Sequence, residues 1–219
     1  MSAGAFRIAV LISGTGSNLQ ALIDATAAGR IPGRIDLVLS NRPKAGGLAR
    51  ARRSGICAEA LPHEHYPSRD AYDAALAHRL AELAPDLVVL AGFMRILSPA
   101  FVTRFRGRLI NIHPSLLPAY RGLHTHERAL ADGATEHGCS VHFVTPDLDA
   151  GPVIAQAALP VQGDDTPASL AARVQTLEHR LYPLVVRWLA EGRVAMRNGQ
   201  VWLDGEPLAR PPCLAVSED

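Results

Sequence analysis

The first two-thirds of the sequence alternates short apolar runs with segments of helical periodicity. The apolar run 8–12 leads into a segment in which Leu19, Leu22 and Ile23 recur at helical spacing. Such alternation is typical of parallel strands joined by crossover helices. It predicts an α/β protein with a Rossmann-like, open and mostly parallel twisted sheet that carries helices on both faces. The expected strands are 8–12, 35–39, 57–61, 87–90, 109–112, 140–144 and 153–161.

Capping residues indicate where several helices begin. Ser17 and Ser68 are placed to cap helices, and Thr166 followed by Pro167 is expected to open a long one. A hydroxyl at these positions accepts a hydrogen bond from a backbone N–H of the first helical turn, and proline tolerates the first helical position. We therefore expect each of these residues to mark a helix start.

The C-terminal part predicts a small hairpin. Residues 194–203 alternate around Asn198-Gly199, a pair that favours a tight two-residue turn. We expect one domain over 1–207, with a phosphate-binding half of about 1–105 and a catalytic half of about 106–207, followed by a flexible tail over 208–219.

Charge, hydropathy and cysteine content exclude several classes of function. The 22 Lys and Arg residues nearly balance 21 Asp and Glu, so binding to a nucleic-acid backbone is not expected. No apolar run approaches the roughly 20 residues that a membrane span needs. Cys57, Cys139 and Cys213 lie far apart, which suggests neither a disulfide framework nor a zinc knuckle. We expect a cytoplasmic protein that uses neither nucleic acid nor membrane.

A glycine-rich turn follows the first expected strand. Residues 14–18 (GTGSN) lie before a helix, where backbone N–H groups can approach an anion. A dinucleotide fingerprint would need a third glycine in place of Leu19 and an acidic residue after the second strand, where 39–42 reads LSNR. The turn also lacks the lysine of a P-loop. The pattern favours a lone phosphate, and a plain tight turn capped by Ser17 stays open as the alternative.

Residues 111–118 (NIHPSLLP) carry the densest chemistry. Asn111 and His113 have period-two spacing at the end of an expected strand, so both project to one face. An amide donor beside an imidazole can stabilise an oxyanion and move a proton, as acyl transfer requires. The acidic turn 147–152 (DLDAGP) supplies Asp149 as a partner for His113. The residues alone equally allow structural roles, in which Asn111 and His113 cap the strand and Asp149 makes an Asx turn.

Further histidines raise a metal alternative, because imidazole is a common zinc ligand. They stand at His124, His126, His137 and His142. Carboxylate ligands at helical spacing and the H-E-x-x-H pattern are missing, so we expect no metal. His142 alternates with apolar neighbours, and we expect it to reach the same cleft as His113.

Taken together, four motifs resemble the folate-dependent formyltransferases. They are 13–20 (SGTGSNLQ), 91–97 (AGFMRIL), 111–118 (NIHPSLLP) and 149–152 (DAGP). The similarity covers about residues 7–207, and the ordered set is far more specific than any single motif. It implies an enzyme of one-carbon metabolism that transfers the formyl group of 10-formyltetrahydrofolate to the amine of glycinamide ribonucleotide in de novo purine biosynthesis, without a metal.

The resemblance also implies roles for individual residues. Asn111 and His113 would hold the oxyanion, and Asp149 would maintain the histidine and help to move a proton through water. The residues implied to bind the ribonucleotide are Gly16, Ser17, Asn18, Leu19, Gln20 and Glu178. Those implied to bind the folate are Arg69, Met94, Arg95, Ile96, Leu97, Asn111 and Val144. By residue type alone, the apolar members read equally well as core, and Arg69 and Glu178 as surface positions.

Residues 119–122 (AYRG) depart from this pattern toward the form seen in methionyl-tRNA formyltransferase. The balanced charge and the lack of residues for that enzyme's C-terminal nucleic-acid-binding domain favour a small acceptor instead. A formyltetrahydrofolate hydrolase shares the catalytic residues, although its usual N-terminal regulatory domain is missing. A non-catalytic folate or nucleotide sensor on the same scaffold is the third possibility. We expect a monomer or homodimer that binds only small molecules.

Overall fold

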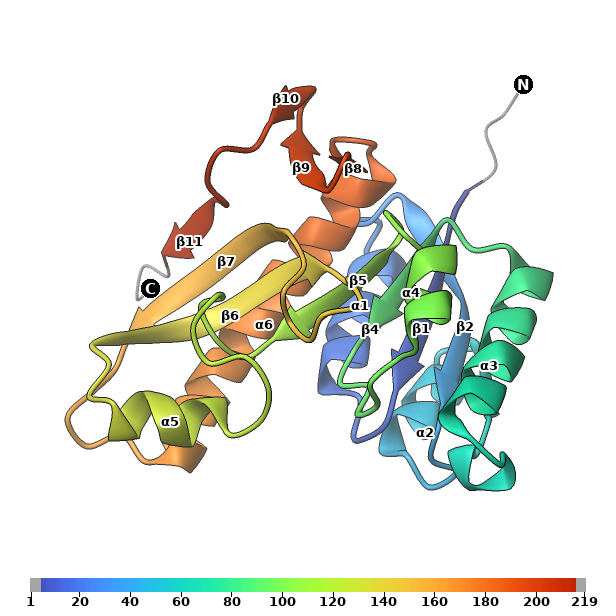
Figure 1. Cartoon of the computed structure of the whole chain (residues 1–219), viewed down its shortest axis with the longest axis horizontal. Helices are drawn as coiled ribbons and strands as arrows, with labels where there is room; N and C mark the ends of the chain where they lie inside the picture. Colours follow the sequence, from blue (N-terminus) through green and yellow to red (C-terminus); the bar gives the residue numbers. More distant parts are fainter. Residues whose placement is uncertain (1–4, 216–219) are drawn as a thin grey trace. The chain divides into compact units, whose positions relative to one another are not determined.

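The computed structural model describes residues 5–215, which belong to two compact units, Met1–Asn111 and Ile112–Asp219 (Figure 1). The first unit is built on a parallel sheet in the strand order β3-β2-β1-β4-β5. Its strands are β1 (Phe6–Ile12), β2 (Gly33–Ser40), β3 (Cys57–Ala60), β4 (Leu87–Leu90) and β5 (Leu109–His113), the last of which runs across the boundary between the units.

The helices of the first unit connect these strands. They are α1 (Ser17–Ala27), α2 (Gly46–Arg53), α3 (Arg69–Leu83) and α4 (Pro99–Arg104), with a 3₁₀ turn, η1, at His63–His65. The chain moves from β1 to β3 in one direction along the sheet and then returns to β4 and β5. Right-handed crossovers therefore put α1 and α2 on one face and α3 and α4 on the other, and each pair packs together.

This reversal creates a switch point between β1 and β4, which are neighbours in the sheet. In open α/β sheets, ligands bind at the carboxyl ends of the strands where the strand order reverses. The glycine turn at 14–16 follows β1, and the segment 91–97 follows β4. The fold of this unit thus places two of the four motifs at the expected ligand-binding edge.

The second unit has a smaller sheet in which β6 (Glu136–Phe143) is antiparallel to β7 (Val153–Pro160). β11 (Cys213–Ala215) adds to β7 in parallel. The long helix α6 (Pro167–Ala190) packs on β6 and β7, and α5 (Thr125–Ala131) packs on α6 (Figure 1). A separate antiparallel sheet consists of β8 (Val194–Arg197), β9 (Gln200–Leu203) and β10 (Glu206–Pro207).

Most predicted elements are confirmed. The α/β class is correct, β4 has the predicted bounds, and Ser68 and Thr166 cap α3 and α6 through their side chains. The turn at Asn198-Gly199 has positive φ at both residues, 50° and 80°, as a type I′ hairpin requires. Within residues 5–215 no helix has the length and apolar character needed to cross a bilayer.

Other predictions were wrong or incomplete. Ser17 is not a cap but the first residue of α1, because Gly16 takes the N-cap position in a left-handed conformation and no side chain caps that helix. β6 begins at Glu136 rather than at residue 140. Its first residues lack the apolar alternation of a strand, and Gly138 allows the carbonyl oxygen of Ala157 on the paired strand β7 to approach closely. The short elements α5 and β11 were not predicted, and β11 lies in the segment expected to be a tail. Residues 216–219 of that segment lie outside the described residues.

Candidate functional site

The glycine turn is held tightly against α2. Gly16 has a φ of +75°, and a Cβ there would lie only 2.7 Å from the Cα of Gly47. The backbone N–H of Gly47 donates to the carbonyl of Gly14 over 3.1 Å. Glycine is therefore required at position 16 both for its conformation and for this close approach. The turn presents the N-terminus of α1, and the N–H groups and dipole of a helix N-terminus favour an anion.

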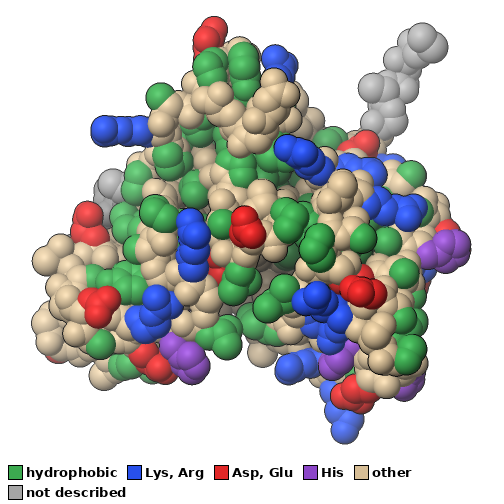
Figure 2. Space-filling model, in the orientation of Figure 1, with side chains coloured by type: hydrophobic (Ala, Val, Ile, Leu, Met, Phe, Trp, Pro, Cys, Tyr) green, Lys and Arg blue, Asp and Glu red, His purple; other side chains and the backbone are tan. Residues whose placement is uncertain are grey.

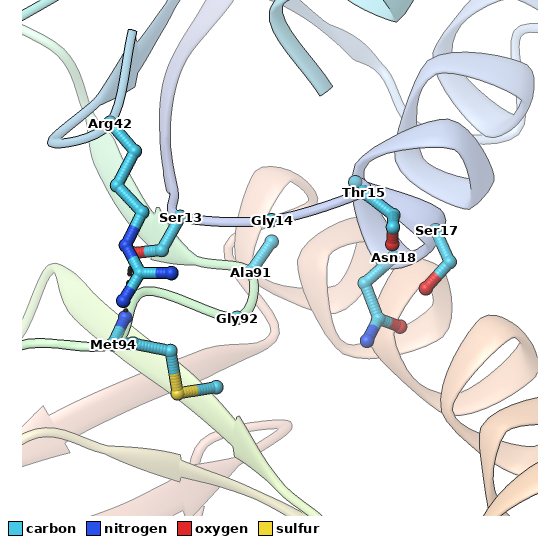
Figure 3. A pocket seen from close by; sticks show the side chains of 10 residues that line it. Ser13, Gly14, Thr15, Ser17, Asn18, Arg42, Ala91, Gly92 and Met94 are labelled. Carbon is cyan, nitrogen blue, oxygen red and sulfur yellow. Dashed lines mark hydrogen bonds between the residues drawn. The ribbon is translucent and has the colours of Figure 1, made fainter. Parts of the chain in front are cut away.

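A pocket of about 210 Å³ opens beside this turn (Figure 3). It is lined by Ser13, Gly14, Thr15, Gly16, Ser17, Asn18, Arg42, Ala91, Gly92 and Met94. Its volume is below the roughly 300–1,000 Å³ of pockets that enclose whole cofactors, so it suits a small group such as a phosphorylated sugar. None of these lining residues carries a carboxylate, and Arg42 carries a positive charge. The pocket is therefore suited to an anion.

Hydrogen bonds join the strand ends that form this pocket. Ser13, after β1, donates through Oγ to Oδ1 of Asn41 over 2.5 Å and accepts from the backbone N–H of Met94 over 2.8 Å. The backbone N–H of Ser13 donates to the carbonyl of Gly92 over 3.1 Å. Residues after β1, β2 and β4 are thus fixed to one another. This makes the pocket a preformed feature of the first unit.

The expected folate residues of the first unit divide into exposed and buried members. Met94 and Ile96 are 62% and 57% exposed, which excludes a core role and leaves two large apolar side chains for a ligand. Leu97 is buried and belongs to the core. The guanidinium of Arg95 lies 4.6 Å from the ring centre of Tyr72, and Arg69 is exposed in the first turn of α3.

The second unit contains a buried histidine–aspartate pair. His113 is 5% exposed, and its Nδ1 lies 3.4 Å from Oδ2 of Asp149, with no residue between them. The same Oδ2 accepts from the backbone N–H of Gly122 over 2.9 Å, while Nε2 of His142 lies 3.8 Å from Oδ1. The carboxylate is therefore surrounded by an amide and two imidazoles. Both of its oxygens therefore lie near groups that can donate hydrogen bonds.

His142 has one defined proton position. Its Nδ1 lies 2.9 Å from the carbonyl oxygen of Phe143, which can only accept, so Nδ1 carries a proton. Burial lowers the pKa of His142, which favours the neutral ring. The expectation that His142 and His113 approach the same site is confirmed, because both face Asp149.

The turn that carries Asp149 is conformationally demanding. Asp149 itself has a φ of +47°, a left-handed conformation. Two residues later, a Cβ on Gly151 would lie 1.7 Å from the carbonyl oxygen of Phe143, so only glycine fits there. The backbone N–H of Phe143 donates to the carbonyl of Pro152 over 3.0 Å. These contacts fix the end of β6 against the turn and thereby position the carboxylate.

The segment after β5 also reaches His113. The backbone carbonyl of Tyr120 lies 2.9 Å from Nε2 of the imidazole. Arg128 of α5 supports this segment, because it donates to the carbonyl of Arg121 over 2.7 Å and its guanidinium lies 5.5 Å from the Tyr120 ring centre. Sequence reasoning left residues 119–122 without a role. In the structure two of them contact the proposed catalytic residues, Tyr120 on His113 and Gly122 on Asp149.

Two of the remaining histidines, His126 and His137, form a pair, whereas His124 lies 3.0 Å from Glu127. Nδ1 of His126 lies 3.1 Å from Nε2 of His137. Burial lowers the pKa of both rings, and that of His137 falls to about 4, so neutral rings share the contact. In the part of the chain that is described, no group of three or more His, Cys, Asp or Glu side chains is placed to hold a metal ion.

Several predicted residues belong neither to the pocket lining nor to the histidine–aspartate pair. The side chain of Leu19 is fully buried, and that of Gln20 donates to Asp24 over 2.9 Å; neither residue lines the pocket. Glu178 is buried on α6, and Val144 is half-buried after β6, both in the second unit. Asn111 is half-buried on β5, two residues before His113, and pairs with Leu90 of β4.

Arg42 also lines the pocket, although the sequence patterns predict no ligand role for it. The available signal was its place directly after β2, at the carboxyl edge of the sheet. The contacts of Tyr120 and Gly122 had no such signal, because they involve backbone atoms.

Comparison with known proteins identifies the family. The family model for formyl transferases matches residues 6–186. The chain is 57% identical to the phosphoribosylglycinamide formyltransferase of Escherichia coli K12 over 94% of its own length and 96% of that protein. It is also similar to the structure of the phosphoribosylglycinamide formyltransferase of Coxiella burnetii, with a TM-score of 0.92 and 53% identity over 95% of this chain and 99% of that one.

A more distant similarity is to a formyltetrahydrofolate deformylase from Pseudomonas syringae. The TM-score is 0.85 and the identity is 25%, over 92% of this chain and 67% of that one. The motifs that resembled folate-dependent formyltransferases thus lie within a region that the family model matches. The chain belongs to the formyl transferase family.

Proposed function

We propose that this chain transfers the formyl group of 10-formyltetrahydrofolate to the amine of glycinamide ribonucleotide in de novo purine biosynthesis. The observation that carries the proposal is the buried His113–Asp149 pair in a chain that matches an E. coli enzyme of this activity over nearly the full length of both. A histidine paired with a carboxylate is suited to stabilising negative charge and moving a proton.

In the proposed reaction the amine nitrogen attacks the formyl carbon, and a new C–N bond forms as the carbonyl oxygen becomes an oxyanion. The imidazolium of His113 and the side-chain amide of Asn111 donate hydrogen bonds to that oxygen. Asp149 supports the positive charge on His113. The bond between the formyl carbon and N10 of the folate then breaks, and the proton lost by the amine is delivered to N10, through water held near Asp149.

The two substrates are assigned to different groups of residues. The phosphate of the ribonucleotide is assigned to Gly16, Ser17 and Asn18, which line the anion-suited pocket. Its ribose is assigned to Glu178. Leu19 and Gln20, in the first turn of α1, are also assigned to the ribonucleotide. The folate is assigned to Arg69, Met94, Arg95, Ile96, Leu97, Asn111 and Val144. We assign the enzyme to the cytoplasm as a monomer or homodimer without a metal.

One assay tests the proposal. Purified protein is incubated with 10-formyltetrahydrofolate, with and without glycinamide ribonucleotide, and loss of the formyl group is followed together with formation of the formylated ribonucleotide. We expect deformylation only when the ribonucleotide is present, in equal amounts with product. His113→Asn serves as the matched catalytic control. Absence of acceptor-dependent transfer by the wild-type chain would refute the proposal.

A formyltetrahydrofolate hydrolase is the second candidate. The similarity to the P. syringae deformylase favours it, because that match extends over most of this chain. In that reaction water replaces the amine as nucleophile, and formate is released. The same assay separates the two functions, since a hydrolase releases formate at an equal rate with and without the ribonucleotide.

A further inference from the structure

Arg42 is the one side chain with a permanent charge among the residues that line the pocket. Its backbone is anchored directly after β2, because its N–H donates to Oγ of Ser40 over 3.0 Å and its carbonyl accepts from the same hydroxyl over 2.9 Å. The preceding residue, Asn41, is buried and hydrogen-bonded to Ser13. The side chain of Arg42 therefore starts from a fixed position while itself remaining exposed.

The pocket has two unlike walls. In Figure 3 the side chain of Arg42 extends past Ser13 toward Met94, while Thr15, Ser17 and Asn18 stand on the other side. The second wall offers hydroxyls, an amide and the N-terminus of α1, all of them uncharged donors or acceptors. A phosphate dianion bound there would be neutralised only by dipoles. The guanidinium supplies the full positive charge that this wall lacks.

The positive charge of Arg42 is also available to a ligand, because among residues 5–215 no carboxylate forms an ion pair with its guanidinium. Arg50, the other arginine near the glycine turn, differs because its Nε donates to the carbonyl of Thr15 over 2.8 Å and it does not line the pocket. Arg50 therefore supports the loop backbone, and Arg42 faces the space that a ligand would fill.

We infer that Arg42 is an anion-binding residue whose guanidinium pairs with the phosphate of the ribonucleotide bound at the N-terminus of α1. The inference rests on the proposed function for the identity of the nucleotide, and on the pocket itself for the phosphate. Arginine suits this role because its planar donors match phosphate oxygens and its charge is permanent. Arg42 thereby replaces the lysine that a P-loop would provide.

Calorimetric binding of four ligands tests the inference: glycinamide ribonucleotide, its riboside without phosphate, ribose 5-phosphate and ribose. We expect Arg42→Gln to weaken both phosphorylated ligands about tenfold at low salt and to leave the riboside and ribose unchanged, because a charge-assisted hydrogen bond is lost. Arg42→Lys should retain part of the affinity. Arg53→Gln is the matched control, since Arg53 is an exposed cation in the last turn of α2 that does not line the pocket.

Salt provides a second readout that a purely steric role would not give. The difference between wild type and Arg42→Gln should shrink as ionic strength rises from about 0.05 M to about 0.5 M, because exposed charges are then screened. A melting temperature of Arg42→Gln equal to that of the wild type would show that the exposed substitution leaves the fold intact.

Three results would overturn the inference. They are wild-type affinity for ribose 5-phosphate in Arg42→Gln, an equal loss for ligands with and without phosphate, and a loss confined to folate binding, which would assign the guanidinium to a folate carboxylate. Failure of the proposed function looks different. A wild-type chain that binds ribose 5-phosphate through Arg42 but transfers no formyl group to glycinamide ribonucleotide would refute the function and support the phosphate site.

Discussion

The carbonyl oxygen of Tyr120 lies 2.9 Å from Nε2 of His113, while Nδ1 of the same ring faces Asp149. Both ring nitrogens therefore face oxygen atoms of the protein. An imidazolium that donates to the formyl oxygen must release one of these contacts. The carbonyl is the one to yield, because Tyr120 belongs to a surface segment whereas the side chain of Asp149 is only 10% exposed.

Substrate binding should therefore change the environment of Nε2 in His113. We expect its nitrogen resonance, measured in histidine-labelled protein and assigned by its loss in His113→Asn, to shift when ribonucleotide and a non-reactive folate analogue bind together. The resonance of Nδ1 should move less, because the contact with Asp149 is kept. A shift at Nδ1 alone would show that the carboxylate yields instead.

Loss of the amide at Asn111 should affect turnover and not ribonucleotide affinity. Removing one donor to an oxyanion costs about 10²-fold or more in turnover, because the interaction exists fully only in the transition state. We expect Asn111→Ala to show this loss in steady-state kinetics, with the ribonucleotide Kd within about twofold of wild type. Turnover at the wild-type level would remove Asn111 from the oxyanion site.

Gly16→Val should weaken binding of the ribonucleotide. The substitution forces a β-branched residue into a φ of +75° and drives its Cβ against the Cα of Gly47, so the turn must move. Gly29→Val is the matched control, since Gly29 has a similar φ of +68° but open space around it. Calorimetry should show a loss of at least about tenfold for Gly16→Val only. Equal affinities in the two variants would place the ligand elsewhere.

His137 should make the fold less stable in mild acid. Burial depresses its pKa from 6.5 to about 4, so above pH 6.5 the ring is neutral in both folded and unfolded chains and costs nothing. As the pH falls from 6.5 toward 4 the unfolded chain takes up the proton first, and stability is lost. The loss is at most about 3.5 kcal/mol, at about 1.4 kcal/mol for each pH unit.

Urea unfolding between pH 7 and pH 4 measures this effect. His137→Gln should show a shallower decline than wild type, although His126 and His142 also have lowered pKa values and contribute to the remaining slope. Identical declines in wild type and variant would contradict the assignment to His137.

The sequence predicted the parts of this fold that local patterns determine. The long helix α6 was found because Thr166 and Pro167 mark its start, and β4 because its four residues are all apolar. The three-residue strand β11 and the seven-residue helix α5 are too short to show a period, and their pairing partners lie far away in sequence. Such elements are defined by tertiary contacts, so they cannot be predicted from local sequence patterns.

The site was predictable to a similar extent. The partnership of His113 with Asp149 followed from residue types and a shared motif pattern, and the two side chains do lie together. The N-cap of α1 was misread because a serine after a glycine looks like a cap, whereas the left-handed conformation of Gly16 is visible only in the structure. The position of Arg42 in the pocket could not be predicted, because it depends on which strands are neighbours in the sheet.

The close approach of Gly151 to the Phe143 carbonyl has an evolutionary consequence. That oxygen also accepts from His142, so any side chain at position 151 would displace an atom that orients one flank of Asp149. Position 151 therefore accepts only glycine. Ala119 and Arg121 are exposed, and their neighbours Tyr120 and Gly122 contact His113 and Asp149 through backbone atoms. The exposed side chains beside His113 can therefore vary, whereas position 151, in the turn that carries Asp149, can only be glycine.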